Sequence, residues 1–282
     1  MNFSQPQADI YVPSGEPPAI ALARTTHLCV AAHQDDIEIM AYHGITECRA
    51  SGDRWFSGVV VTTGAGSPRS GKFARIGADE MQAIRRREQR RAARLGGYNI
   101  QIQLAHASAA TKRPGHSGLS ADLRRIFGAC RPEVVYLHNP ADKHDTHVGV
   151  FLRCLEAIRS LPKPQRPRHV YGCEVWRDLD WLPEDEKVAL DVSAQPRLAR
   201  KLLAVFKSQI AGGKHYDLAV LGRRAGHATF HTAHAVDTTG ALTLAMDLTL
   251  LTQVDSLDVA TYVQRLIRRF RDDVTARLHS LQ

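Results

Sequence analysis

Short apolar runs alternate with longer amphipathic stretches along most of this chain. The apolar runs are bounded by turn residues, which is typical of buried strands, and cover about 26–32, 55–63, 99–104, 133–138, 170–176 and 188–192. The stretches with helical periodicity cover about 37–50, 78–95, 120–129, 144–160, 196–210 and 259–278. This alternation predicts an α/β fold with a mainly parallel sheet and helices on both of its faces.

Two terminal segments depart from the alternation. Residues 1–23 combine several prolines with polar residues, and we expect them to form an extended N-terminal arm. Residues 236–282 end in the last long helical pattern, and we expect a C-terminal helical extension there. The chain of 282 residues suits one large α/β domain that includes both segments.

Composition narrows the class of protein. The five cysteines are scattered without a C-x-x-C pair, so we expect reduced, mostly buried thiols rather than a cysteine metal site. No apolar run approaches the length of a transmembrane helix, and the first residues lack the basic and apolar regions of a secretory signal. A cytoplasmic location is therefore expected.

The formal net charge of +8 opens a second class of function, because a basic surface can bind nucleic acid or another polyanion. The densest basic run, 85–94, has helical periodicity, so its arginines either form a solvated helix face or attract an anionic partner. Aromatic residues make up only 6% of the chain, which leaves few of them for base stacking. We expect no specific nucleic acid partner, and a non-catalytic polyanion-binding module is the alternative.

The residues that carry chemistry follow two of the predicted strands. His33, Asp35 and Asp36 follow the first strand, and His144 and His147 follow the fourth, each group at the start of a predicted helix. Open α/β sheets bind their ligands at the carboxyl ends of the strands. Two histidines and a carboxylate are an established ligand set for catalytic zinc and for non-haem ferrous iron, with an open position for water. Adjacent aspartates repel each other unless a cation compensates them, which also favours a metal.

These side chains divide into complementary roles. If Asp36 ligates the metal, Asp35 is left to accept a proton from water as a general base. His144 could donate a proton to a leaving amine or stabilise an oxyanion. The set predicts metal-assisted hydrolysis of a small acyl bond.

Other residues have two interpretations each. Arg85 either pairs with Glu88 on the same helix face or points into the site and binds a substrate oxygen. The glycine-rich segment 64–71 lacks P-loop spacing and is either a mobile flap or a connector. Four further histidines either border the site or have packing and surface roles: His138, His227, His231 and His234.

The two motifs that follow the first and fourth predicted strands resemble those of the PIG-L (LmbE-like) de-N-acetylase family. That family has His-Pro-Asp-Asp-Glu after the first strand and His-Pro-Asp-His at the start of a later helix. The corresponding segments here are His33-Gln34-Asp35-Asp36-Ile37 and His144-Asp145-Thr146-His147. Weaker matches are Arg85 to Glu88 with Leu95-Gly96, Ser208-Gln209, and Arg223-Arg224-Ala225-Gly226. Order and spacing agree over about residues 25–235.

The resemblance implies a Rossmann-like fold and a divalent metal, commonly zinc, with Fe²⁺ as another option. It implies hydrolysis of the acetamide of an N-acetylglucosamine-type sugar or glycoconjugate, which releases acetate and a free amine. Carried over by position, the metal ligands are His33, Asp36 and His147, the general base is Asp35, His144 is the acid or oxyanion stabiliser, and Arg85 binds the sugar.

The chain also departs from the family pattern. Gln34 replaces proline, which should loosen the turn slightly, and Ile37 replaces glutamate. Asp145 and Thr146 replace proline and aspartate in the later motif, so a hydrogen bond to a ligand or to His144 is lost or rerouted. These departures bear on the substrate more than on hydrolysis. Another small-metabolite amide or ester is therefore an alternative substrate, and a homo-oligomer is left open.

Overall fold

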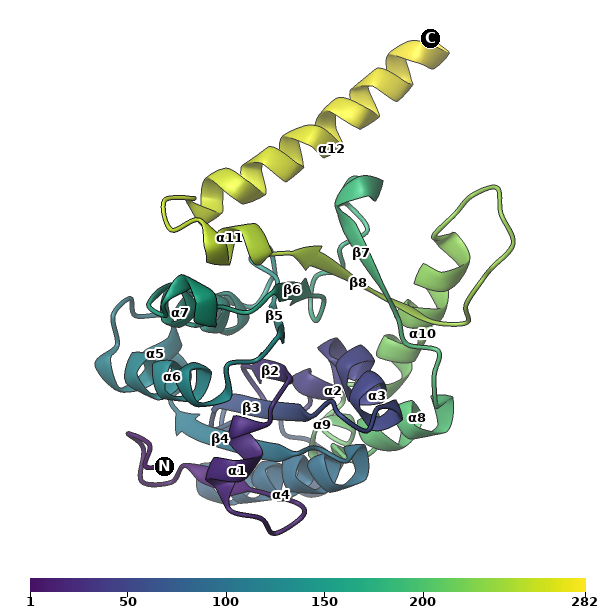
Figure 1. The fold of residues 1–282 in the computed structure, drawn as a ribbon. Helices are drawn as coiled ribbons and strands as arrows, with labels where there is room; N and C mark the ends of the chain where they lie inside the picture. The colour runs from purple at the N-terminus through teal and green to yellow at the C-terminus, as the bar shows by residue number, and fades with distance from the viewer.

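The computed structural model describes residues 1–282 and contains one eight-stranded sheet (Figure 1). The strands are β1 (Asp9–Tyr11), β2 (His27–Ala31), β3 (Phe56–Thr62), β4 (Ile100–His106), β5 (Val134–His138), β6 (His169–Cys173), β7 (Lys187–Asp191) and β8 (Leu242–Asp247). Their order across the sheet is β1-β4-β3-β2-β5-β6-β8-β7. The run from β4 to β6 is parallel, which confirms the predicted α/β class and the mainly parallel sheet.

Helices cover both faces of the sheet. They are α1 (Pro18–Ala23), α2 (Asp36–Met40), α3 (Tyr42–Ala50), α4 (Ala78–Gly96), α5 (Ser108–Thr111), α6 (Ser117–Cys130), α7 (Asp145–Arg159), α8 (Pro196–Leu203), α9 (Lys207–Ile210), α10 (Tyr216–Phe230), α11 (Thr249–Gln253) and α12 (Val259–Leu281). None of them combines the length and the hydropathy needed to cross a bilayer.

The strand periodicity of two divides the interior into two cores. In β2, Leu28 and Val30 belong to a core shared with α1, α6 and α7. Cys29 and Ala31, which face the other way, belong to a core shared with α2, α3, α4 and α8. Because every residue of β2 is buried, this strand is a nearly continuous apolar run, as strands covered on both faces are.

The order of the parallel strands creates a switch point between β2 and β5. From β2 the chain moves outward on one side to β3 and β4, and then crosses back to β5 on the other side of β2. The helices that follow β2 and β5 therefore diverge to opposite faces of the sheet and leave a crevice at the strand ends. Both predicted chemical motifs begin at this crevice.

The expectations for the two termini need correction. Residues 1–23 are not simply extended: they include β1, which pairs antiparallel with β4, and α1. Ser4 fixes this segment to the body through bonds from its backbone N–H (3.0 Å) and its hydroxyl (2.6 Å) to the buried Asp122. Residues 236–282 are not wholly helical, because β8 lies between β6 and β7 and is antiparallel to both.

Helix continuity also differs from the prediction. The helix expected over 37–50 is divided into α2 and α3 at Ala41, and the helix expected over 196–210 is divided into α8 and α9. Helix α10 has no counterpart among the helices predicted from the sequence. The end of α4 matches the expectation, because Gly97 takes the left-handed conformation (φ 69°) that terminates a helix.

The close approach of α7 to the backbone at the end of α5 supplies a test of the packing. A Cβ at Gly149 would lie 2.8 Å from the carbonyl oxygen of Thr111, whereas a Cβ at Gly128 in α6 meets open space. We expect Gly149→Ala to lower the free energy of unfolding by about 1–3 kcal/mol through overpacking. We expect Gly128→Ala to raise it by up to about 1 kcal/mol through helix propensity. Chemical denaturation of both variants checks this, and equal effects would contradict the close approach.

Candidate metal centre

The turn after β2 presents three side chains to the crevice. His33 begins this turn, Asp35 adopts an unusual backbone conformation (φ 89°, ψ −31°), and Asp36 begins α2. The Asp36 carboxylate folds back and accepts a hydrogen bond from the backbone N–H of His33 at 2.7 Å. A positive φ at a non-glycine residue costs on the order of 1–3 kcal/mol, and such strain clusters at functional sites. The Asp35 N–H is held by Oε1 of the buried Gln89 at 3.3 Å.

The start of α7 presents two histidines from the other side of the switch point. His144 is the N-cap of α7, and its Nδ1 accepts a hydrogen bond from the backbone N–H of Thr146 at 3.2 Å. His147 lies one turn further and is completely buried. The rings of His144 and His147 stack with centroids 4.6 Å apart, and His144 meets His33 edge-on at 5.0 Å.

Three donor atoms from these two segments converge. Nδ1 of His33 lies 3.2 Å from Oδ2 of Asp36 and 3.2 Å from Nε2 of His147. Nε2 of His147 lies 3.4 Å from the same Asp36 oxygen. Ligands about 2.0–2.1 Å from a tetrahedral metal are about 3.3 Å from one another, so the three atoms fit one face of such a site. The geometry of this triangle, His33, Asp36 and His147, matches a two-histidine, one-carboxylate set with one open side.

Two further histidines lie close to this triangle: His144, which forms a convergent group with His33 and His147, and His138. Nε2 of His138 lies 3.6 Å from the Asp36 carboxylate, and with Asp36 and His147 it forms a second convergent group. However, that nitrogen accepts a hydrogen bond from the backbone N–H of Ala32 at 2.9 Å, so its lone pair is already used. Its ring stacks on His147 with centroids 3.9 Å apart. His138 therefore supports His147 and does not compete for the ligand set.

Asp142 is a functional candidate that the sequence analysis missed. Its Oδ2 lies 3.1 Å from Nδ1 of His147, and both side chains are fully buried. A carboxylate on the far nitrogen of a ligand histidine fixes its tautomer and orientation. The same carboxylate group also accepts hydrogen bonds from the backbone N–H groups of His144 and Trp176. The sequence did contain a signal for this role: Asp142 is an acidic residue in the turn after β5, two positions before His144.

The charges around the triangle favour the ionised form of Asp36 and the protonated form of His147. Burial opposes ionisation of Asp36, but His147 and His33 together hold its pKa below the ordinary value. Burial likewise disfavours the charged form of His147, but Asp36 and Asp142 raise its pKa above the ordinary value. The pKa of His33 is lowered by burial, against the opposing effect of Asp36. Asp36 and Asp142 therefore form a concentrated negative site that a cation would complement.

Asp35 lies at the edge of the same site in a different environment. Burial raises the pKa of Asp35 well above its ordinary value, with Arg85 opposing the shift. The nearest guanidinium nitrogen of Arg85 lies 3.5 Å from the Asp35 carboxylate. Asp35 is thus oriented by an arginine and is not part of the triangle.

Of the two interpretations of Arg85, the pairing with Glu88 does not occur in the structure. Glu88 instead accepts hydrogen bonds from the backbone N–H (2.8 Å) and hydroxyl (2.6 Å) of Ser208. Arg85 is buried and lines the cleft, and it donates to Ser67 at 2.6 Å and to the side chain of Gln34 at 3.1 Å. Arg85 and Glu88 do not pair because each forms hydrogen bonds with a different segment.

Gln34 does not loosen the turn, contrary to expectation. Its side-chain oxygen accepts from Arg85, its amide nitrogen donates to Gln103 at 3.2 Å, and its backbone carbonyl also accepts from Arg85. Side-chain hydrogen bonds therefore replace the restraint that a proline ring would supply.

A cleft of about 420 Å³ opens over the triangle. It is lined by His33, Asp35, Asp36, Ile39, Gly64, Gly66, Ser67, Pro68, Arg85, Ser108, His144, Val175, Trp176, Gln209, Lys214 and Tyr216. The glycine-rich segment thus forms one wall. Another wall contains Trp176, which meets Tyr216 edge-on at 6.1 Å and carries the ammonium of Lys214 over its ring at 4.9 Å. The sequence analysis did not single out this group, because it comes from separate segments without a motif.

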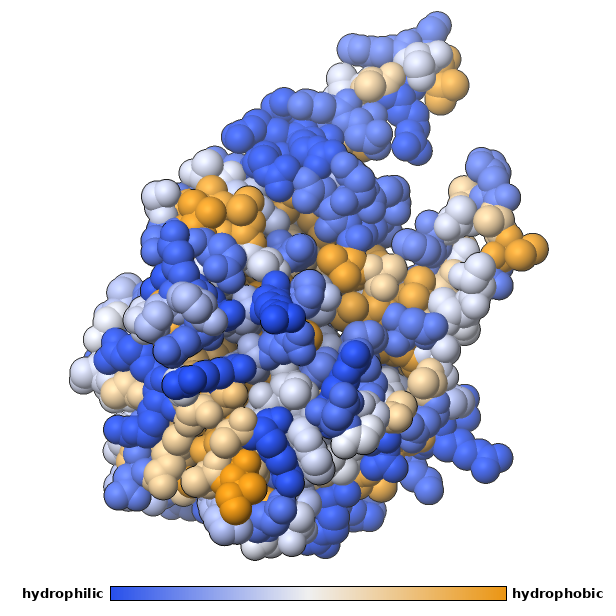
Figure 2. All heavy atoms as spheres, viewed as in Figure 1, coloured by the Kyte–Doolittle hydropathy of each residue, from blue (hydrophilic) through white to orange (hydrophobic).

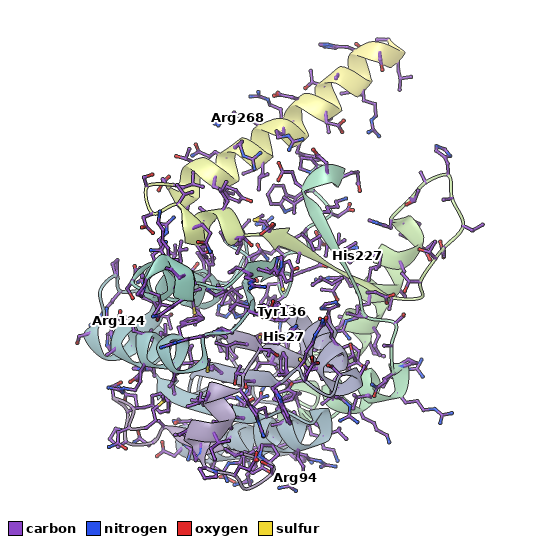
Figure 3. The ribbon with its side chains drawn as sticks, in the orientation of Figure 1. His27, Arg94, Arg124, Tyr136, His227 and Arg268 are labelled. Carbon is purple, nitrogen blue, oxygen red and sulfur yellow. The ribbon has the colours of Figure 1, made fainter.

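The remaining candidate histidines lie outside the cleft lining. His227, on α10 (Figure 3), lies 3.0 Å from the buried carboxylate of Glu174 and fastens α10 to the segment after β6. His231 and His234 are exposed in the segment that follows α10. The packing interpretation therefore holds for His227.

Comparison with known proteins adds independent support for the two motifs. The model of the family described as GlcNAc-PI de-N-acetylase, PIG-L, matches residues 28–158. No curated protein is significantly similar to the chain in sequence.

Solved structures share the fold at low identity. A conserved protein of Thermus thermophilus has a TM-score of 0.62 at 17% identity, covering 84% of this chain and 98% of that chain. The N,N'-diacetylchitobiose deacetylase of Pyrococcus horikoshii has a TM-score of 0.59 at 18% identity, covering 78% and 83%. The 4-carboxy-2-hydroxymuconate hydratase of Pseudomonas putida KT2440 has a TM-score of 0.57 at 17% identity, covering 79% and 96%.

The matched region includes all of β2 except its first residue, all of β5 and the turns that follow them, so it contains every residue of the triangle. Residues 28–158 thus match the PIG-L family model, and the solved structures at low identity share the fold of the chain.

Proposed function

We propose that this protein is a divalent-metal-dependent hydrolase that removes the acetyl group from an N-acetylglucosamine-type sugar or glycoconjugate. The observation that carries the proposal is the triangle of His33, Asp36 and His147, with atoms 3.2–3.4 Å apart, at the floor of the cleft. The family match and the deacetylase of Pyrococcus horikoshii with the same fold support the reaction class.

In this proposal His33, Asp36 and His147 hold the metal, which is Zn²⁺ or another divalent ion such as Fe²⁺. When bound, such an ion polarises an acyl carbonyl and makes water a better nucleophile at neutral pH. Asp142 keeps the Nδ1 proton of His147 in place, so that Nε2 presents its lone pair to the metal.

Asp35 is the proposed general base. Its carboxylate lines the cleft beside the triangle without belonging to it, and the Arg85 contact and the Gln89 bond fix its position. A carboxylate in that place accepts the proton of the attacking water and can return it to the departing nitrogen.

His144 is the proposed oxyanion stabiliser. Because its Nδ1 accepts the Thr146 N–H, its proton resides on Nε2, and the side chain lines the cleft. A neutral imidazole N–H is a hydrogen-bond donor to a developing oxyanion rather than a strong acid. Of the two roles considered for His144, this geometry favours the oxyanion role.

The walls of the cleft support a sugar-sized substrate. Trp176 and Tyr216 supply aromatic surface of the kind that packs on the apolar face of a pyranose, and Ser67 and Gln209 supply polar atoms. The hydratase of Pseudomonas putida shares the fold, so the fold by itself does not determine the reaction. Another small amide or ester is the alternative substrate.

Loss of one ligand should remove the metal. We expect purified protein to carry about one divalent ion per chain and His147→Ala to lose it, since two ligands bind far more weakly than three. Elemental analysis after dialysis measures this, with the exposed His169→Ala as control. Full metal content in His147→Ala would refute the ligand set.

Neutralising Asp142, whose carboxylate contacts Nδ1 of His147, should weaken metal binding without abolishing it. We expect Asp142→Asn to lower metal affinity by about 10–100-fold, the usual effect of altering a carboxylate bonded to a ligand histidine. Competition with a fluorescent chelator measures the affinity. The matched control is Asp145→Asn, nearby in sequence and exposed, which should bind metal as the wild type does.

Removing the base should separate metal binding from turnover. We expect Asp35→Asn to retain metal but release acetate from N-acetylglucosamine-type substrates at least about 100-fold more slowly, the scale of general-base removal. The readout is enzymatic acetate detection alongside elemental analysis. A wild-type rate in this variant would exclude the base role.

A further inference from the structure

The C-terminal helix α12 is only partly packed on the body. Within its 23 residues, only Tyr262 and Leu266 are buried, both in the first half. The outer half projects away from the other helices (Figure 1), and a groove separates it from the segment 180–187. The outer half alone is on the order of 12 residues long, and an isolated helix of that length is marginal in water. In proteins, the stability of such a helix comes chiefly from packing of an apolar face.

That outer half carries an unpartnered apolar stripe. The α12 stripe consists of Ile267, Phe270, Val274, Leu278 and Leu281, which are 49, 41, 40, 56 and 81% exposed. At about 100° per residue these side chains fall within about 80° of arc, so they form one face. Apolar atoms are visible on the free end of α12 in Figure 2. Exposed apolar faces of this kind mark interaction surfaces.

The spacing of the stripe is symmetric. Successive members are separated by 3, 4, 4 and 3 residues, so the series is the same in both directions about Val274. In an antiparallel pair of identical helices a two-fold axis brings each residue opposite its mirror position, so this symmetric spacing lets every apolar member of the stripe meet another one. A heterologous partner imposes no such symmetry.

We propose that α12 pairs antiparallel with α12 of a second copy of this chain, with the two-fold axis at Val274. Ile267 then packs on Leu281 of the second copy, Phe270 packs on Leu278, and Val274 packs on itself. The groove between Phe270, Val274 and Leu278 and the segment 180–187 of the same chain has a volume of about 570 Å³, which offers room for incoming side chains.

The charges beside the stripe fit this register. Asp273 and Arg277 lie on the same flank of the stripe, 3.5 Å apart within one helix. In an antiparallel pair this flank meets the same flank of the second copy, so Asp273 of each copy lies beside Arg277 of the other. A parallel pair would bring the flank against the opposite flank and lose both of these ion pairs. Arg269 is already bound to Asp185 and Glu186 of the body, and Arg268 lies on the far side of α12 from β7 (Figure 3).

Single cysteines test both the pairing and its direction. The five native cysteines are buried and do not interfere. Val274→Cys should form a disulfide-linked dimer under mild oxidation, because this residue lies on the axis. Ile267→Cys and Leu281→Cys should each remain uncrosslinked alone and form a crosslinked heterodimer when mixed. Asp272→Cys, on the opposite face, should not crosslink.

Sedimentation of uncrosslinked protein provides the second measurement. The full chain should dimerise, and Val274→Lys should raise the dimer dissociation constant at least about tenfold, because each interface would then bury two unpaired ammonium groups. Acetate release should be unchanged, so failure of this proposal is separate from failure of the proposed function. A wild-type chain that stays monomeric up to about 100 µM overturns the proposal and assigns the stripe to a different partner. Crosslinking of Ile267→Cys alone overturns the antiparallel register.

Discussion

The convergence of two strand ends at the β2–β5 switch point is the constraint on which the rest of the site depends. His33 and Asp36 follow β2, His147 follows β5, and their donor atoms lie 3.2–3.4 Å apart. His33 and His147 are 114 positions apart along the chain, so it is the parallel pairing of β2 with β5 that brings them together. Burial makes this costly, because a carboxylate removed from water must be compensated by cations or donors. The backbone N–H of His33, the imidazoles and, in the proposed function, a bound metal together meet that demand.

The surroundings of the triangle hold it rigid by polar contacts rather than by apolar packing alone. Gln34, Gln89 and Arg85 link the turn after β2 to α4, and Glu88 links α4 to Ser208 in α9. Charge-assisted hydrogen bonds of this kind fix direction as well as distance. The positive φ of Asp35 is consistent with this picture, because strained conformations persist only where neighbouring contacts over-determine them.

Local sequence signals predicted the parallel core well and the edges poorly. The parallel strands are buried, mostly apolar runs with clear turn boundaries, and both chemical motifs follow such strands. By contrast, β8 follows a long irregular segment, and its strand character depends on pairing with β6 and β7. The division between α2 and α3 at Ala41 involves neither glycine nor proline, and tertiary packing overrides helix propensity there. The roles of Gln89 and Trp176 arise from contacts between distant segments, which no local spacing encodes, whereas the position of Asp142 two residues before His144 was a local signal.

The departures from the family motifs now have a physical interpretation. Thr146 replaces the aspartate of the later motif, yet Asp142 supplies the carboxylate on His147, so the support of this histidine does not depend on residue 146. Gln34 replaces proline and restrains the turn through Arg85 and Gln103. The placement of the triangle therefore does not depend on having the family's residues at positions 34 and 146.

What remains free to vary is the outer wall of the cleft, where Trp176, Lys214 and Tyr216 come from the segment after β6 and from the start of α10. The backbone N–H of Trp176 donates to Asp142, which supports His147, but no hydrogen bond or ion pair joins the side chains of Trp176, Lys214 and Tyr216 to the triangle. A change in this wall can therefore alter which molecule fits over the triangle without disturbing the triangle itself. Under the proposed function, selectivity for the acyl substrate is therefore determined by residues remote in sequence from the two motifs.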